Sequence, residues 1–220
     1  MNDAVIIEPT EAHRASIIWL HGLGSDGHDF EPIVPELRLP PGLGVRFIFP
    51  NAPMRPVTIN GGMVMRSWYD IKDSDLSVAR HRPDFDSSAV ILENWINGEI
   101  ESGIPANKII VAGFSQGGAI ALHCGLAFKQ KLAGLLILSS YLPFADVLEQ
   151  DSAQFNKEIP ILMMHGEYDP VIPVGFAKQS CEVLQNHDYA VEWNHYPMQH
   201  AVCAEEIERI GQWLLGQLDT

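Results

Sequence analysis

The stretch Lys108–Gly118, K-I-I-V-A-G-F-S-Q-G-G, joins a strand pattern directly to a helix pattern. Its first part is a continuous apolar, β-branched run, which is typical of a strand covered on both faces. Gly113, Ser115 and Gly117 then form G-x-S-x-G, and a helical pattern runs from about Gln116 to Lys129. A sharp turn of this kind between a strand and a helix presents its serine above the sheet. The stretch therefore predicts a nucleophilic serine, Ser115, at the carboxyl end of a strand.

Steric crowding explains why glycines flank Ser115. The tight turn strains the serine backbone and brings the residues on either side of it close together, so only small side chains fit there. The turn also directs the free N–H groups of the following helix, and the positive end of its dipole, toward any oxyanion formed nearby. A short G-x-S-x-G string also arises by chance, so the flanking strand and helix carry the prediction.

Further strands and helices alternate along the chain. Apolar runs predict strands at 16–20, 45–49, 134–140, 161–166 and 190–196, in addition to 108–114. Helical patterns cover about 86–101, 174–186 and 201–218. This alternation predicts the α/β class, with a mostly parallel central sheet and helices on both faces. A length of 220 residues with 46% hydrophobic content fits a single domain spanning 1–220.

Two of the helical patterns also predict a buried face. The last helix carries one apolar stripe, and the helix over 86–101 has a similar grouping with Asp86 or Ser87 as a candidate N-cap. The residues of the two faces are Ile207, Ile210, Trp213, Leu214 and Leu218 in the last helix, and Val90, Ile91, Trp95 and Ile100 in the earlier one.

The segment at about 51–85 departs from the alternation. It mixes proline, glycine and apolar residues, and it predicts a lid-like excursion with a short hairpin around Asn60-Gly61. Long loops in compact domains are often lids or binding loops, although a connection without a role is the alternative. Its 60–67 stretch, N-G-G-M-V-M-R-S, could touch a membrane surface transiently through Met63, Val64 and Met65.

Composition limits the partners and the compartment. Fourteen Lys and Arg against 28 Asp and Glu give a net charge of −14, which repels nucleic-acid phosphates and anionic lipid surfaces. We therefore expect no nucleic-acid partner. Cys124, Cys181 and Cys203 are few, odd in number and far apart, which favours a reducing compartment and a cytoplasmic location. Neither a secretory signal nor a membrane-spanning apolar run of about 20 residues is expected.

A nucleophilic serine needs a base, and the base needs an orienting carboxylate. These partners are expected at the carboxyl ends of later strands. Asp169 follows the strand pattern at 161–166, with Glu167 as the alternative carboxylate. Of the nine histidines, only His200 both follows Ser115 in the chain and lies in a short loop between the last strand and the final helix. A catalytic Ser115–Asp169–His200 set is predicted, although a solvent-exposed loop histidine is the alternative for His200.

The glycine-rich loop at 21–27, H-G-L-G-S-D-G, fits two different chemistries. Its spacing matches G-x-G-x-x-G, which binds dinucleotides after a strand. However, the next strand does not end in the acidic residue that such a site requires, and Asp29 and Glu31 would oppose a pyrophosphate. The alternative is an oxyanion hole. In that case the backbone N–H groups of Leu23 and Gln116 are the two donors.

No metal or other cofactor is predicted. Two groups of side chains carry the donor atoms that divalent ions accept, but neither has an H-E-x-x-H or comparable spacing. One group is His165, Glu167 and Asp169, and the other is His21, Asp26 and His28.

Five motifs in order carry a family resemblance: H-G-L-G-S-D-G-H-D-F, N-A-P-x-R-P-V-T-I-N-G-G, S-W-Y-D-I, G-F-S-Q-G-G and H-G-E-Y-D-P-V-I-P. From about residue 5 to 218 the chain resembles the acyl-protein thioesterase and phospholipase/carboxylesterase family, and within it the bacterial carboxylesterases. The resemblance implies an α/β-hydrolase fold, a Ser115–Asp169–His200 triad, oxyanion donors at Leu23 and Gln116, and no cofactor.

The resemblance also implies substrates, namely small-molecule or lipid esters and thioesters of short to medium acyl chains, including lysophospholipids. Together with the apolar excursion, it is compatible with a homodimer. A non-catalytic α/β-hydrolase-like protein that binds a small ligand or a partner is the alternative. The candidate acyl-binding residues, each of which could equally belong to the core, are Leu23, Trp68, Tyr141, Val171 and Ile172.

Two positions depart from the family pattern. Gln199 stands where M-G-H is common before the final helix, and Tyr141 stands where many members have the tryptophan of S-x-W-L-P-L. Both substitutions lie near the predicted acyl site, so the chain-length preference of the family is not carried over to this protein.

Overall fold

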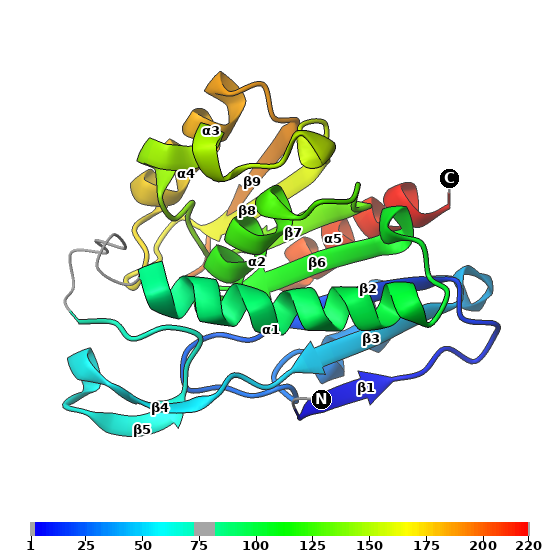
Figure 1. Ribbon diagram of the computed structural model, residues 1–220, viewed down its shortest axis with the longest axis horizontal. Coiled ribbons are helices and arrows are strands. Elements are labelled where there is room, and N and C mark those ends of the chain that lie inside the picture. The colour runs from blue at the N-terminus through cyan, green and yellow to red at the C-terminus, as the bar shows by residue number, and fades with distance from the viewer. Residues whose placement is uncertain (1–2, 73–81, 220) are drawn as a thin grey trace.

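The computed structural model describes residues 3–72 and 82–219 of the chain. Its main sheet has seven strands in the order β1-β3-β2-β6-β7-β8-β9 (Figure 1). Neighbouring strands are parallel except for β1, which pairs with β3 in the antiparallel direction at one edge. The strands are β1 Ala4–Ile7, β2 Ala15–Leu20, β3 Val45–Pro50, β6 Ile109–Phe114, β7 Gly134–Leu138, β8 Ile161–Gly166 and β9 Val191–Tyr196. The predicted mostly parallel sheet is confirmed.

Strand β6 lies at the centre of this sheet. It pairs with β2 on one side, where Ile17 faces Ile110, and with β7 on the other, where Leu136 faces Ala112. The central strands are buried along almost their whole length, which explains their continuous apolar runs. The turn after β6 therefore places Ser115 at the middle of the carboxyl edge of the sheet.

Helices cover both faces of the sheet, as predicted. Helices α1, α2 and α4 contribute to one hydrophobic core, and α5 contributes to the other together with the 3₁₀ helix Glu31–Leu37. Figure 1 shows α1 and α2 in front of the sheet and α5 behind it. The helices are α1 Arg82–Glu101, α2 Gln116–Ala127, the short α3 Leu148–Asp151, α4 Val174–Asn186 and α5 Ala204–Leu218.

The predicted face of α1 is wrong. The helix extends back to Arg82, so neither Asp86 nor Ser87 is its N-cap, and Val90 is 53% exposed. The residues that do pack inward follow an i, i+4, i+7, i+11 spacing: Phe85, Ala89, Leu92 and Ile96. Ile91, Trp95 and Ile100 lie only at the border of the core. Because α1 also packs against α2, tertiary contacts decide which of two apolar sides is buried.

The stripe of α5 is confirmed. Ile210, Trp213, Leu214 and Leu218 are buried, and Ile207 packs at the border of the same core. Strand β1 was not predicted from the sequence. It has only four residues, and its position at the edge depends on a nonlocal pairing with β3.

The excursion after residue 51 contains the predicted hairpin. Strands β4 Met54–Val57 and β5 Met63–Arg66 pair in the antiparallel direction, and Gly61 and Gly62 turn the chain with φ values of 67° and 79°. Such positive φ values favour glycine. Figure 1 shows the hairpin beyond the sheet, near the start of α1. The part of the excursion at 73–81 lies outside the described residues.

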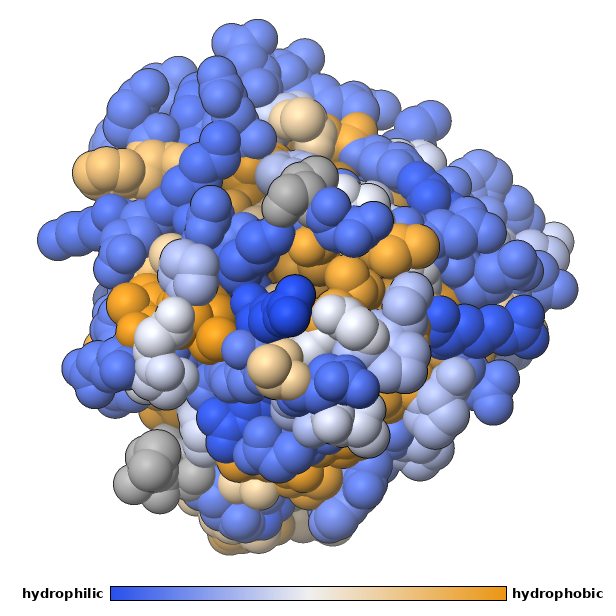
Figure 2. Space-filling view, turned by 90° about the vertical axis from the view of Figure 1, so that its right-hand side faces the viewer, coloured by the Kyte–Doolittle hydropathy of each residue, from blue (hydrophilic) through white to orange (hydrophobic). Residues whose placement is uncertain are grey.

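Figure 2 shows the opposite end of the molecule, which is the right-hand side of Figure 1, where the C-terminus lies. Hydrophilic side chains cover most of this face, and the hydrophobic groups lie mainly in its hollows. Among the described helices, none combines the length and the apolar character needed to span a membrane.

Candidate active site

Ser115 lies in a strained turn between β6 and α2. Its backbone has φ 53° and ψ −119°, a combination that costs a non-glycine residue about 1–3 kcal/mol. Two bonds hold the turn in place: the Ser115 N–H donates to the Leu138 carbonyl at 2.9 Å, and the Ser140 hydroxyl donates to the Ser115 carbonyl at 2.7 Å. The strained turn predicted from the sequence is present.

The neighbouring glycines have no room for a side chain. A Cβ atom on Gly113 would lie 2.3 Å from the Gly117 carbonyl carbon, and one on Gly117 would lie 2.4 Å from the Leu20 carbonyl oxygen. The two glycines of the motif therefore contact each other, and the turn also packs against the end of β2. The close approach predicted from G-x-S-x-G is confirmed.

Gly117→Ala should therefore lower the free energy of unfolding by about 3 kcal/mol, because the backbone oxygen of Leu20 cannot rotate away from the added methyl group. Gly98→Ala in α1 is the matched control, since a Cβ there meets no atom within 4 Å. It should be neutral or stabilising by up to about 1 kcal/mol. Urea unfolding of both variants measures the difference, and equal stabilities would contradict the steric argument.

A hydrogen-bonded chain connects Ser115, His200 and Asp169. His200 Nε2 lies 2.9 Å from Ser115 Oγ, and His200 Nδ1 lies 2.7 Å from Asp169 Oδ2. Because a carboxylate can only accept, Nδ1 carries the proton, and Nε2 is free to accept the proton of Ser115. The three residues follow β6, β8 and β9, so the parallel sheet brings them together at one edge.

The Asp169 carboxylate is buried and held from several sides. Its Oδ1 accepts the backbone N–H groups of Val171 at 2.8 Å and Ile172 at 2.9 Å. His165 Nε2 lies 3.3 Å from Oδ2 and 2.8 Å from the Ile172 carbonyl. Burial lowers the pKa of His165, so this ring is neutral and donates from Nε2 to the carbonyl. His165 thus ties the loop that carries Asp169 to the end of β8.

Sequence reasoning did not find this role for His165. The sequence offers His165 as one of the histidines competing for the role of base and as a metal ligand with Glu167 and Asp169. Its one signal is a histidine inside an otherwise apolar strand, four residues before an aspartate. In the structure Glu167 turns to the surface, where its carboxylate lies 2.8 Å from His195 Nδ1. Of the two carboxylates, Asp169 contacts His200.

The second group with metal-ligand atoms, His21, Asp26 and His28, also does not converge. His28 lies at the surface, 2.7 Å from Glu31, whereas both ring nitrogens of His21 are engaged by backbone groups inside the protein. Within the ranges 3–72 and 82–219, no three His, Cys, Asp or Glu side chains are arranged to hold a metal ion.

The glycine-rich loop after β2 lies beside the turn at Ser115. A Cβ on Gly22 would be 3.2 Å from the Phe114 ring and 3.5 Å from Ser115 Cβ. The N–H groups of Leu23 and Gln116 donate no hydrogen bond to any residue in the described part of the chain. Two backbone donors that have no acceptor within residues 3–72 and 82–219 thus belong to the two loops that meet at Ser115.

Three of the five candidate acyl-binding residues belong to the core. Trp68, Tyr141 and Ile172 are buried, whereas Leu23 is half-buried and Val171 is 57% exposed. The Tyr141 hydroxyl lies 2.8 Å from that of Tyr69, and burial raises the pKa of Tyr141 to about 12. The core alternative is thus favoured for the first three, and Leu23 and Val171 remain candidates for acyl contact.

A buried carboxylate lies at the start of α5, just after His200 in the chain. Glu206 is fully buried, and burial raises its pKa from 4.5 to about 8, with the backbone N–H of Cys203 opposing the shift. The group facing it from β9 is the Tyr196 phenol, whose own pKa is raised by burial and by this carboxylate. The folded protein therefore favours the protonated form of Glu206, and this buried carboxyl group loses its proton only as the pH rises above about 8.

Glu206 should make the protein less stable as pH rises from about 4.5 to about 8. Over this window the folded state binds more protons than the unfolded state, so unfolding becomes easier by up to about 1.4 kcal/mol per pH unit. Glu206→Gln cannot ionise, so its stability relative to the wild type should increase across the window and level off above it. Urea unfolding at pH 5 and pH 8.5 measures this, and an equal difference at both values would contradict it.

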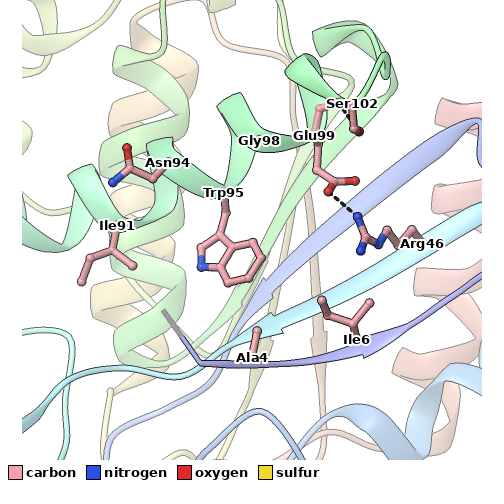
Figure 3. A pocket seen from close by; sticks show the side chains of 9 residues that line it. All are labelled: Ala4, Ile6, Arg46, Ile91, Asn94, Trp95, Gly98, Glu99 and Ser102. Carbon is pink, nitrogen blue, oxygen red and sulfur yellow. Dashed lines mark hydrogen bonds and ion pairs between the residues drawn. The ribbon is translucent and has the colours of Figure 1, made fainter. Parts of the chain in front are cut away.

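A separate cavity of about 610 Å³ lies between α1 and β1. In Figure 3, Trp95 points from α1 toward Ala4, and the Arg46–Glu99 ion pair lies at the other end. The residues that line it include no histidine, and the carboxylate among them, Glu99, is paired with Arg46. This cavity therefore lacks the nucleophile and base found around Ser115. The lining residues are Ala4, Ile6, Arg46, Ile91, Asn94, Trp95, Gly98, Glu99 and Ser102.

Curated proteins similar to this chain are acyl-protein thioesterases. Acyl-protein thioesterase 1 of Neurospora crassa is 39% identical over 97% of this chain and 91% of the fungal protein. Acyl-protein thioesterase 1 of Saccharomyces cerevisiae is 33% identical over the full length of both. The narrower likeness to bacterial carboxylesterases stays a prediction.

Solved structures agree with these relatives. The structure of Arabidopsis thaliana SOBER1 superposes with a TM-score of 0.84 at 28% identity, covering 93% of this chain and 99% of that one. Acyl-protein thioesterase 2 of Zea mays has a TM-score of 0.85 at 29% identity, covering 99% and 100%. The expected α/β-hydrolase fold is confirmed. Because the profile of the phospholipase/carboxylesterase family matches residues 1–215, the chain belongs to that family.

Proposed function

We propose that the protein is a serine hydrolase that cleaves carboxylic esters or thioesters of short to medium acyl chains through an acyl-enzyme. The observation that carries the proposal is the continuous hydrogen-bond chain from Ser115 Oγ through His200 to Asp169. The thioesterase activity in the names of its relatives supports the same reaction class. In this proposal Ser115 is the nucleophile, His200 the base and Asp169 the orienting carboxylate.

The first half of the reaction acylates the enzyme. His200 Nε2 takes the Ser115 proton while Oγ attacks the carbonyl carbon of the substrate, and the C=O electron pair moves onto oxygen. The N–H groups of Leu23 and Gln116 stabilise this oxyanion, and Asp169 stabilises the imidazolium. Collapse of the intermediate breaks the bond to the alcohol or thiol, which takes the proton from His200.

The second half releases the acid. His200 removes a proton from water, the resulting nucleophile attacks the acyl-enzyme carbonyl, and the same two N–H groups bind the second oxyanion. Collapse of this intermediate returns the proton to Ser115 Oγ and frees the carboxylic acid. Each step uses only water, the side chains of Ser115, His200 and Asp169, and the backbone N–H groups of Leu23 and Gln116.

A fluorophosphonate probe tests the nucleophile directly. Ser115 Oγ should attack the probe phosphorus and displace fluoride, which leaves a covalent adduct on the wild type. Ser115→Ala should remain unlabelled. If the folded wild type fails to react, the alternative gains support, namely a non-catalytic α/β-hydrolase-like protein that binds a small ligand or a partner.

A comparison of kcat/KM values across a panel of substrates tests which class of ester or thioester the protein prefers. The panel consists of p-nitrophenyl esters, acyl-thioesters and lysophospholipids, each at several chain lengths. We propose that esters or thioesters of short to medium chains have the highest values. A higher value for long-chain lysophospholipids would instead assign a lysophospholipase.

We also propose that the hairpin contacts membrane surfaces transiently. Met63 is 63% exposed and Val64 is 59% exposed at its tip, whereas Met65 is half-buried. A net charge of −14 opposes anionic lipids, so the contact is expected with zwitterionic vesicles. Replacing Met63 and Val64 with serine should reduce co-sedimentation with phosphatidylcholine vesicles. Val90→Ser, which removes an exposed apolar side chain from α1, should not; equal binding of all three proteins would contradict the proposal.

Two further proposals concern assembly and location. The same exposed hairpin residues could join two copies, and sedimentation velocity should then show dimers for the wild type and monomers for the Met63 and Val64 double variant.

A cytoplasmic location is supported by the three cysteines, all of which are free thiols. Cell fractionation checks that location, and recovery in an oxidising compartment would contradict it.

A further inference from the structure

The side chain of Gln116 is buried and bonded at both ends. Its Oε1 accepts the backbone N–H of Trp68 at 2.9 Å, and its Nε2 donates to the Tyr69 carbonyl at 2.6 Å. The Ser67 hydroxyl lies 3.2 Å from both amide atoms. Gln116 is the residue directly after Ser115, so the turn that carries the nucleophile is tied to the chain segment at 67–69.

The same segment is tied to the glycine-rich loop. The indole Nε1 of Trp68 donates to the His21 carbonyl at 2.9 Å. One residue before the segment, the Arg66 carbonyl accepts the N–H of Gly24 at 2.9 Å. These two bonds lie on either side of Leu23 in the chain. One engages His21, two residues before it, and the other engages Gly24, one residue after it.

We propose that the segment Arg66–Tyr69 is a brace that sets the distance between the two oxyanion donors. The positioning groups are the Gln116 carboxamide, which holds one donor loop, and the Trp68 indole, which holds the other. Neither group touches the reacting atoms; each acts through the backbone N–H it positions. This inference rests on the proposed function and extends it, because it assigns positioning roles to the Gln116 carboxamide and the Trp68 indole, which are part of neither the proposed triad nor the oxyanion hole.

The brace matters because an oxyanion hole depends on fixed geometry. Donors stabilise the developing charge when they lie about 2.7–3.1 Å from the oxyanion position, and they act strongly because they need no reorganisation. Loops rich in glycine do not hold such a distance by themselves. A misplacement of about 1 Å can cost about 100-fold in rate. The buried bonds of the brace supply the missing rigidity.

Gln116→Met tests the brace, since it keeps the backbone N–H and similar side-chain volume but removes the carboxamide bonds. We expect kcat toward a p-nitrophenyl ester to fall about 10- to 100-fold with KM changed less than about threefold. Binding of an alkyl trifluoromethyl ketone, whose Ser115 adduct carries an oxyanion, should weaken by the same factor. Binding of a non-hydrolysable ether analogue, which forms no oxyanion, should not change.

Trp68→Phe is the second variant, because it retains an aromatic ring and removes the indole N–H that bonds to the His21 carbonyl. It should show the same pattern of losses and, combined with Gln116→Met, less than additive effects. Ser88→Ala is the matched control: its hydroxyl donates to the Trp68 carbonyl from α1, outside the link between the two loops. Its kcat should stay within about threefold of the wild type.

Two results would overturn the brace. One is a kcat within about threefold of the wild type in both folded variants. The other is an equal loss of ketone and ether binding, which would indicate general distortion of the site. If Gln116→Met does not fold, Trp68→Phe decides by the same criteria. Failure of the proposed function itself looks different, since the wild type would then neither turn over esters nor react with the fluorophosphonate.

Discussion

Replacing His200 with alanine should lower kcat/KM for ester hydrolysis by about 10⁴- to 10⁶-fold. Without the imidazole, Ser115 has no acceptor for its proton, because the Nε2 atom 2.9 Å from Oγ is lost. The residual rate would come from binding and from the oxyanion donors alone. Steady-state kinetics with a p-nitrophenyl ester measure the loss. The same variant should also react much more slowly with the fluorophosphonate, since that step needs the same proton transfer.

His195→Ala is the matched control for this experiment. His195 precedes His200 by five residues, lies at the surface and contacts Glu167. Its removal should leave kcat/KM within about twofold of the wild type, because surface substitutions away from special features change stability by no more than about 0.5 kcal/mol. A His200→Ala protein as active as its parent, or a large loss in His195→Ala, would end the assignment of the base.

Asp169→Asn should lower kcat by about 10⁴-fold, with little change in KM. An amide can donate toward His200 Nδ1, which would favour the tautomer that carries its proton on Nε2 and can no longer accept from Ser115. It also removes the negative charge that stabilises the imidazolium. Raising the pH should not restore the rate, because the fault lies in the tautomer rather than in protonation.

Glu167→Gln separates the two carboxylates that the sequence left as alternatives. Glu167 contacts an exposed histidine, whereas the buried Asp169 carboxylate contacts His200. The Glu167 variant should keep kcat within about twofold of the wild type. If instead it lost activity while Asp169→Asn retained it, the orienting carboxylate would have to be reassigned.

Much of the site was predictable because its signals are local. The motif around Ser115 specifies a strand, a cramped turn and a helix within eleven residues. The clashes that a Cβ atom would meet at Gly113 and Gly117 explain why both positions are glycine. Parallel strands also send all their carboxyl ends to one edge, so chain order together with the loop between the last strand and the final helix was enough to select His200. The continuous apolar runs predicted buried strands for the same reason, since burial on both faces leaves no polar alternation.

Other features depended on contacts between distant segments. The inward side of α1 was mispredicted because two apolar sides compete along its sequence, and only packing against α2 and the sheet selects one. Trp68 was a candidate for the acyl wall, yet its indole lies in the core and bonds to His21. His165 was considered as a metal ligand, yet it holds the loop of Asp169.

The amino-acid sequence by itself determined the strand–turn–helix unit of Ser115, the α/β alternation and the order of the three candidate catalytic residues. These depend on backbone sterics and on periodic burial, which act over a few neighbouring residues. Only the tertiary structure decided which carboxylate contacts His200, and which side chains bond the loops that carry Leu23 and Gln116. Those choices depend on hydrogen bonds between residues about 30 to 90 positions apart, such as Gln116 with Tyr69 and His200 with Ser115, and no local pattern encodes such distances.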